Sequence, residues 1–126
     1  MTNTTDFTDR ELDIMSVLWR EGSGTVAEVR EALDGSAGYT TVLKLLQILE
    51  EKGAVRHESE GRAYRYHPVT EADAASGPAL KRLLDTVFRG SAELALARLV
   101  TEADPTGPEL SRMRALLEKL EREGAR

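Results

Sequence analysis

The chain has 126 residues, of which 40% are hydrophobic and 31% are charged, and its net charge is −5. This length allows one domain or two small subdomains with a modest core, and the composition is ordinary for a globular protein. The sequence contains no cysteine, which excludes disulfides, a thiolate nucleophile and thiolate metal sites. No apolar run approaches the roughly 20 residues that cross a bilayer, and the polar start has no signal-peptide pattern. We therefore expect a cytoplasmic protein with no membrane partner.

The distribution of charge restricts how this chain could bind nucleic acid. Sequence-independent affinity for DNA comes mostly from Lys and Arg side chains that neutralise phosphates, so a net charge of −5 disfavours an indiscriminate binder. Residues 1–70 carry eight basic and twelve acidic side chains, whereas residues 39–67 carry five and four. The middle of the chain is close to neutral, and any DNA binding must use a local basic face.

Four helix starts are marked by a Thr followed three residues later by an acidic residue. In this pattern the hydroxyl caps a backbone N–H, and the carboxylate lies near the positive end of the helix dipole. The four segments are Thr8–Glu11, Thr25–Glu28, Thr70–Asp73 and Thr106–Glu109. After the first two, apolar residues keep helical spacing as far as Gly22 and Gly35. The sequence therefore predicts two short helices joined by the segment EGSGT.

Residues 39–53, YTTVLKLLQILEEKG, predict a third helix that ends at Gly53. Its apolar residues recur at i, i+3, i+4 and i+7, and they are Val42, Leu45, Leu46 and Leu49. On a helical wheel the opposite side carries Thr40, Lys44, Gln47 and Glu51. The apolar set forms the predicted buried face. The polar set is not needed for packing and is available for another role.

Residues 54–69, AVRHESEGRAYRYHPV, predict a β-hairpin. With Glu60 and Gly61 as the two loop residues, the register pairs Ser59 with Arg62, His57 with Tyr64, Arg56 with Arg65, and Val55 with Tyr66. Alternation then places Val55, Tyr64 and Tyr66 on one face and both Arg56 and Arg65 on the other. Two cations directly opposite each other repel unless an anion lies nearby.

The order of these elements predicts a fold that is mainly α with a small β-hairpin. Three helices in about 50 residues followed by a hairpin are the order of a winged helix-turn-helix. The rest of the chain predicts three more short helices, which cannot build much of a core alone and should pack against a second copy. We assign residues 1–70 to a winged-helix DNA-binding domain and residues 71–126 to a helical dimerisation region.

The outer face of the third helix is the candidate DNA-binding site. Lys44 can donate to guanine or to phosphate, and Gln47 can form the amide pair with adenine. Thr40 and Thr41 can bond a phosphate at the helix N-terminus or touch a thymine methyl group. The alternative is that these are solvated polar residues of an amphipathic helix.

The hairpin supplies two further candidates, Arg62 and Arg65, which could reach phosphate or the neighbouring minor groove. The alternative for both is an ordinary exposed strand. His57 and His67 lie on opposite faces of the predicted hairpin without a third ligand, so we expect no metal and no cofactor. The sequence has no G-x-S-x-G elbow and no P-loop, so we also expect no enzymatic activity.

Four segments together resemble the penicillinase-repressor family of bacterial regulators (BlaI/MecI/CopY type). They are ELDIMSVLW, TVAEVREAL, YTTVLKLLQILEEKG and EGRAYRYHPV. The family motifs correspond here to Trp19, Thr40–Val42, Leu49–Gly53 and Gly61–Pro68, and the resemblance is specific over residues 7–70. It implies a homodimeric winged-helix repressor that binds near-palindromic, double-stranded operator DNA and dimerises through its C-terminal helices.

The chain departs from the family pattern in ways that concern specificity and regulation. The family commonly has basic residues at the positions that Leu43 and Ile48 occupy here. Relatives that respond to β-lactams are cut by a membrane sensor-protease at an Asn-Phe bond, but the only Asn of this chain is Asn3, and the copper-responsive branch carries cysteines that this chain lacks. The inducing signal and any upstream sensor-protease therefore stay open.

An alternative function is a winged-helix protein-interaction module without DNA binding, in which Leu43 and Ile48 would be exposed and dock a partner.

Overall fold

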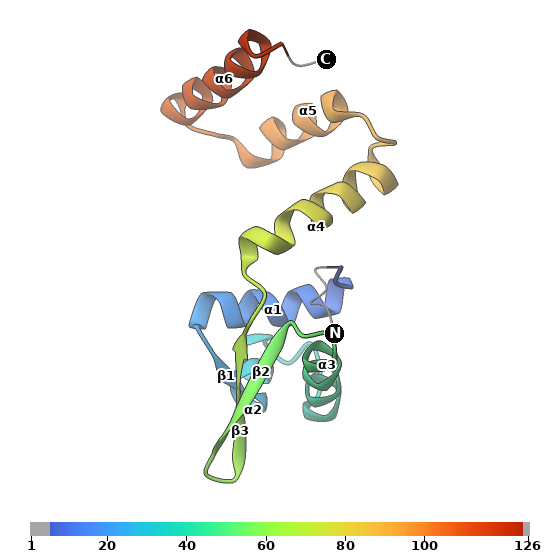
Figure 1. The fold of residues 1–126 in the computed structure, drawn as a ribbon, viewed down its shortest axis with the longest axis vertical. Coiled ribbons are helices and arrows are strands. Elements are labelled where there is room, and N and C mark those ends of the chain that lie inside the picture. The colour runs from blue at the N-terminus through green and yellow to red at the C-terminus, as the bar shows by residue number, and fades with distance from the viewer. Residues whose placement is uncertain (1–5, 125–126) are drawn as a thin grey trace. The chain divides into compact units, whose positions relative to one another are not determined.

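A computed structural model describes residues 6–124 (Figure 1), and Asn3 lies outside this range. The elements in order are α1 (Asp9–Glu21), β1 (Gly24–Thr25), α2 (Val26–Ala32), α3 (Tyr39–Glu51), β2 (Val55–Glu60), β3 (Ala63–Pro68), α4 (Ala72–Val87), α5 (Ala92–Ala103) and α6 (Gly107–Arg122). The chain forms two compact units, Met1–Arg82 and Leu83–Arg126, and the boundary in the sequence falls within α4. The predicted fold class, mainly α with a β-hairpin, is confirmed.

The predicted caps of the first two helices are confirmed. The Thr8 and Thr25 hydroxyls accept hydrogen bonds from the backbone N–H groups of Glu11 and Glu28. The Glu11 and Glu28 carboxylates in turn accept hydrogen bonds from the backbone N–H groups of Thr8 and Thr25. These reciprocal bonds satisfy donors that have no partner inside the helix. Local sequence therefore fixes where α1 and α2 begin.

The third Thr-x-x-acid segment behaves differently from its prediction. Thr70 is buried and lies ahead of α4, and its hydroxyl has no hydrogen-bond partner among the described residues. Its backbone is held instead, because its N–H donates to Ala54 and its carbonyl accepts the indole N–H of Trp19 at 2.8 Å. Tertiary contacts thus outweigh the capping pattern at this position. The fourth segment does cap, since the Thr106 hydroxyl accepts the N–H of Glu109 at the start of α6.

The end of α3 has the geometry that the sequence predicts. Gly53 has a φ of +82° and donates to the carbonyl of Glu50, while Ala54 donates to the carbonyl of Leu49. This pair of bonds is the Schellman motif, in which glycine takes the left-handed position. The chain therefore leaves α3 in a fixed direction and enters β2 two residues later.

The core of the first unit lies between α1, α2, α3 and the sheet. Val42, Leu46 and Leu49 of α3 are fully buried, whereas Leu45 is only partly buried. The remaining buried apolar residues are Phe7, Ile14, Met15, Val17, Leu18, Val26, Val29, Ala54, Val55, Tyr66 and Ala75. The apolar stripe of α3 therefore holds this helix to the domain and leaves its opposite side free.

The hairpin forms, but its predicted register is wrong. Gly61 and Arg62 are the loop residues, and the strands pair Val55 with Pro68, His57 with Tyr66, and Glu60 with Ala63. Gly61 has a φ of +61°, whereas Arg62 is not among the described residues with positive φ. Glycine at the first loop position is typical of a type II′ turn, and a Glu60–Gly61 loop of type I′ would need positive φ at a Glu.

The predicted assignment of side chains to the two faces of the hairpin still holds. The pairing shifts by two residues, and an even shift preserves the alternation. Tyr64 and Tyr66 share a face with Val55, as predicted. On the other face Arg56 lies opposite His67, and Arg65 lies opposite Glu58. The predicted pair of opposed cations is therefore absent from this hairpin.

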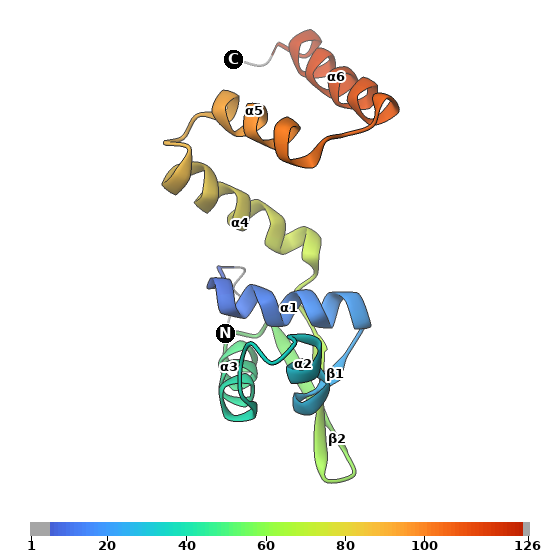
Figure 2. The same ribbon diagram turned by 180° about the vertical axis from the view of Figure 1, so that it is seen from behind.

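The segment between α1 and α2 contributes a third strand that the sequence did not suggest. Gly24 and Thr25 pair with Tyr66 and Arg65, so the sheet has the order β1-β3-β2. A Cβ at Gly24 would lie 3.1 Å from a Val29 methyl group. Figures 1 and 2 show β2 and β3 extending from this short sheet, with their turn at the end farthest from α1.

The second unit is helical and keeps many apolar side chains at its surface. No residue of α5 or α6 is buried. The exposed apolar residues of these two helices are Leu94, Leu96, Leu99, Leu110, Leu116, Leu117 and Leu120. Within the part of the chain that the structure describes, no helix combines the length and apolarity needed to span a membrane.

Candidate nucleic-acid interface

The outer face of α3 is open along its length. Thr40, Thr41, Lys44 and Gln47 are all exposed, on the side away from the buried Val42. In residues 6–124 none of these four side chains makes a hydrogen bond or an ion pair. The face therefore carries a hydroxyl pair, an ammonium group and an amide that are free to bind a ligand.

The N-terminus of α3 has no side-chain cap. Gly38 occupies the N-cap position, and no side chain accepts a hydrogen bond from the first turn. In contrast, α1, α2, α5 and α6 each have a Thr or Ser cap. The first backbone N–H groups of α3 are donors without helical acceptors, and its first turn contains no acidic residue. This end of α3 is thus suited to an anion such as a DNA phosphate.

The two unusual apolar positions of α3 are less exposed than the interaction-module alternative requires. Leu43 and Ile48 are both half-buried, and Leu43 packs against the core. They border the polar face and do not form an apolar patch on it. Tyr39, the first residue of α3, is 50% exposed and lies beside Thr40 and Thr41. It extends this surface and was not among the predicted DNA-binding residues.

Arg62 lies in the turn of the hairpin and is exposed. Its guanidinium has no ion-pair partner within residues 6–124. A cation at the end of a projecting hairpin is placed to reach a phosphate or a minor groove beside the one occupied by α3.

Arg65 is in a different environment, although it lies only three residues farther along the chain. Its Nη1 and Nη2 each lie 3.0 Å from a carboxylate oxygen of Glu28 on α2. Its Nε and Nη2 lie 2.7 Å and 2.9 Å from the carboxylate of Glu60 on β2, and Nη1 also donates to the Ser23 hydroxyl at 3.2 Å. We refer to Arg65, Glu28, Glu60 and Ser23 as the Arg65 network.

The charges of this network stabilise each other. Hydrogen bonds from Arg65 lower the pKa of Glu28 and the pKa of Glu60 below their usual value. The bonds to Glu60 and then to Glu28 raise the pKa of Arg65 in turn. All three groups are therefore ionised at neutral pH, and the network carries one more negative than positive charge.

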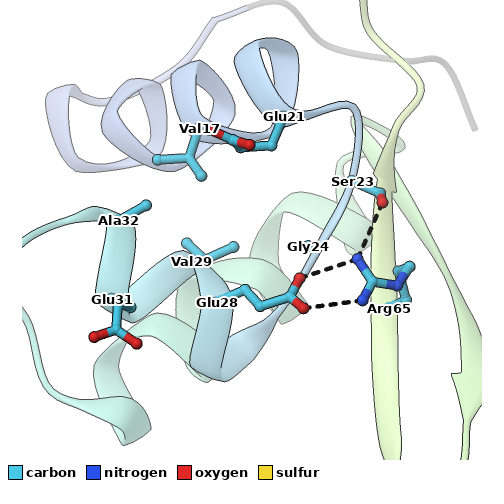
Figure 3. A pocket seen from close by; sticks show the side chains of 9 residues that line it. All are labelled: Val17, Glu21, Ser23, Gly24, Glu28, Val29, Glu31, Ala32 and Arg65. Atoms are coloured by element: carbon cyan, nitrogen blue, oxygen red, sulfur yellow. Dashed lines mark hydrogen bonds and ion pairs between the residues drawn. The ribbon is translucent and has the colours of Figure 1, made fainter.

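The network borders a pocket of ≈ 470 Å³ between α2, the end of α1 and β3 (Figure 3). Figure 3 shows the Arg65 guanidinium directed toward Glu28 and Ser23, with Glu21 and Glu31 also on the wall. Three carboxylates and one guanidinium line this opening, so it is unsuited to an anionic ligand such as a phosphate.

A second contact joins the hairpin to α3. Nδ1 of His57 lies 2.8 Å and 2.7 Å from the two carboxylate oxygens of Glu50, and the His57 ring contacts Tyr64 at a centroid distance of 4.3 Å with the ring planes tilted by 38°. His57 and His67 lie on opposite faces, as predicted. Among the described residues, no three His, Asp or Glu side chains are grouped so as to hold a metal ion.

The fold and this surface define a winged-helix transcriptional regulator. The sequence profile of the penicillinase repressor family matches residues 7–119. The chain belongs to the penicillinase repressor family, as its motifs indicate, and this is a family of transcriptional repressors and not of enzymes.

Two known relatives align with nearly the whole chain. A penicillinase repressor of Bacillus licheniformis is 25% identical over 122 residues, which cover 94% of each chain. The transcriptional regulator BlaI of Mycobacterium tuberculosis is 34% identical over 125 residues, which cover 96% of this chain and 89% of the relative.

Two solved structures are similar in fold. The DNA-binding domain of the repressor BlaI superposes with a TM-score of 0.52 at 29% identity, over 58% of this chain and 93% of that one. A mutant of MarR from E. coli superposes with a TM-score of 0.53 at 18% identity, over 91% of this chain and 78% of that one.

Proposed function

We propose that this chain is a homodimeric repressor that reads a near-palindromic operator with α3 and contacts the flanking phosphates with the β2–β3 hairpin. The observation that carries the proposal is the outer face of α3, where Thr40, Lys44 and Gln47 are exposed and have no partner among the described residues. Side chains of these types bind base edges and phosphates in the major groove.

One feature of α3 and the similarity to known proteins support this use. The uncapped N-terminus of α3 offers backbone donors to a phosphate beside Thr40 and Thr41. The relatives are described as a repressor and as a transcriptional regulator, and the similar solved domain is described as DNA-binding. Because operator DNA is the proposed ligand, we infer that the protein acts in the cytoplasm.

The proposed dimer is supported by the second unit. Its helices bury no residue by themselves, and α5 and α6 border an apolar groove of ≈ 410 Å³ lined mostly by leucines. Exposed apolar surface of this kind is typical of a protein–protein contact. A two-fold dimer would present two copies of α3 to two half-sites of the operator.

The direct test is selection of duplexes from a random pool by the full-length protein, followed by titration of the enriched duplex at several salt concentrations. We expect an enriched sequence with two-fold symmetry, and an affinity that falls steeply with salt. Enrichment of no sequence, or an affinity that is indifferent to salt, contradicts the proposal.

A further inference from the structure

We propose that Arg65 is a positioning residue that holds the β2–β3 hairpin against α2, and that it is not itself a phosphate contact. This inference rests on the proposed function, because the hairpin matters as a DNA contact only if the protein binds DNA. It differs from the sequence-based expectation, in which Arg65 reaches the DNA alongside Arg62.

The first argument is that the donors of Arg65 are already used. A guanidinium has five N–H groups, and Arg65 makes five hydrogen bonds: two with Glu28, two with Glu60 and one with Ser23. A phosphate could bind only by displacing a carboxylate or the Ser23 hydroxyl. Arg62, at the turn, has no such competitor within the described residues.

The second argument is electrostatic. Two carboxylates accompany the one guanidinium, and Glu21 and Glu31 line the same opening (Figure 3). A phosphate that approached Arg65 would meet a net negative charge. The side chain of Arg65 is also only 23% exposed, compared with 56% for Glu28 and 53% for Glu60, so the carboxylates lie on the solvent side of the contact.

The third argument is the position of the network in the fold. The backbone of Arg65 pairs with Thr25, the N-cap of α2, and Glu28 completes the capping box of the same helix. One carboxylate therefore supports both the start of α2 and the side chain of β3. On the opposite face of the hairpin, His57 is bound to Glu50 of α3. The hairpin is thus attached to both helices of the helix-turn-helix, and this attachment sets where Arg62 lies relative to α3.

The two roles predict opposite effects in matched variants. Arg65→Lys keeps the positive charge but loses the planar fork, so a phosphate contact would tolerate it and a two-carboxylate contact would not. The double variant Glu28→Gln/Glu60→Gln keeps Arg65 but removes its partners' charge, and Gln at position 28 still completes the cap. It would weaken DNA binding if Arg65 positions the hairpin, and strengthen it if Arg65 binds phosphate.

The probes are a duplex enriched by the wild-type protein and a duplex of random sequence. We expect Arg65→Lys and the double Gln variant each to lower affinity for the enriched duplex roughly tenfold, with the salt dependence of wild type. Arg56→Lys, at an Arg whose ion pair with Glu58 is more than half exposed, should bind as wild type does. An unchanged affinity of Arg65→Lys, or a gain in affinity in the double Gln variant, overturns the inference.

A measurement without DNA separates this inference from the proposed function. Amide hydrogen exchange on the free full-length protein should be faster in β1 and β3 of Arg65→Lys, and unchanged in Arg62→Lys. Equal protection of β1 and β3 in Arg65→Lys and wild type overturns the inference even if both bind DNA. Failure of the wild-type protein to enrich any duplex overturns the proposed function, and exchange still decides whether Arg65 holds the hairpin.

Discussion

Nζ of Lys52 lies 2.7 Å from Oε1 of Glu11, which joins the end of α3 to the first turn of α1. Glu11 is 3% exposed, and the same oxygen accepts the N–H of Thr8. This carboxylate is therefore a capping group and the buried half of an ion pair with Lys52. Because α3 carries the candidate DNA-binding face, the pair also fixes one end of that face to the rest of the domain.

Removing Lys52 should destabilise the fold strongly, because it leaves the Glu11 carboxylate buried without a cation. We expect Lys52→Met to lower the free energy of unfolding by about 3 kcal/mol, as is typical of a broken buried pair. Arg20→Met, which breaks a pair with Glu21 that is more than half exposed, should cost less than about 1 kcal/mol. Urea unfolding followed by circular dichroism measures both. Equal losses in the two variants contradict the prediction.

Lys44 and Gln47 should carry sequence selectivity. We expect the double variant Lys44→Ala/Gln47→Ala to lower the ratio of affinities for the enriched and random duplexes by roughly 10- to 100-fold, since a bidentate base contact contributes about 1–3 kcal/mol of discrimination. Arg10→Ala is the control, because Arg10 is exposed on α1. Fluorescence anisotropy measures both ratios. Retained selectivity in a folded double variant shows that α3 does not read the bases.

Much of the fold could be predicted because its signals are local. The Thr caps of α1 and α2, the glycine stops of α1 and α3 and the apolar spacing of residues 42–49 each act within a few residues and place these features correctly. The predicted stop at Gly35 is wrong, because α2 ends at Ala32 with Leu33 as its C-cap. The hairpin register failed because it depends on which loop residue takes a positive φ. A Gly61–Arg62 loop in place of a Glu60–Gly61 loop shifts the pairing by two residues, and the sequence alone does not distinguish the two loops.

The candidate site likewise has one part that could be predicted from local sequence and one part that could not. The open face of α3 follows from helical periodicity, so the exposure of Lys44 and Gln47 could be predicted. The surroundings of Arg65 could not, because Glu28 lies 37 residues away in the sequence. The ion pair depends on the pairing of Gly24 and Thr25 with Tyr66 and Arg65 as β1, and the sequence GSG is equally compatible with a simple connection.

Arg62 should contribute to binding without contributing to selectivity. If it contacts one phosphate, Arg62→Ala should weaken binding to the enriched and random duplexes alike and reduce the slope of log affinity against log salt by about one. Arg56→Ala is the matched control, because Arg56 lies at the base of the hairpin and pairs with Glu58. Titrations at four salt concentrations give the slopes. A slope that stays at the wild-type value in Arg62→Ala rules out the contact.

Acid should weaken the Arg65 network. The pKa values of Glu28 and Glu60 are lowered in the folded protein by hydrogen bonds from Arg65. A carboxylate whose folded pKa lies below its unfolded pKa adds stability above the unfolded pKa, near 4.5, and this stability is lost as pH falls through the folded pKa. We therefore expect the urea midpoint to decline below about pH 4.5, and to decline less in Glu28→Gln/Glu60→Gln. Parallel pH profiles for the two proteins contradict this assignment.

The apolar groove of α5 and α6 should hold two copies together. Leu99 and Leu117 line it and are 54% and 49% exposed, so burying a carboxylate there would be costly. We expect the full-length protein to sediment at twice its 13.9 kDa chain mass, and Leu99→Glu/Leu117→Glu to weaken the dimer by roughly 100-fold or more. Thr101→Glu introduces a carboxylate on α5 away from this groove and should leave the dimer intact. A monomeric mass for wild type at micromolar concentration excludes the dimer, and dissociation by Thr101→Glu places the interface on another face of α5.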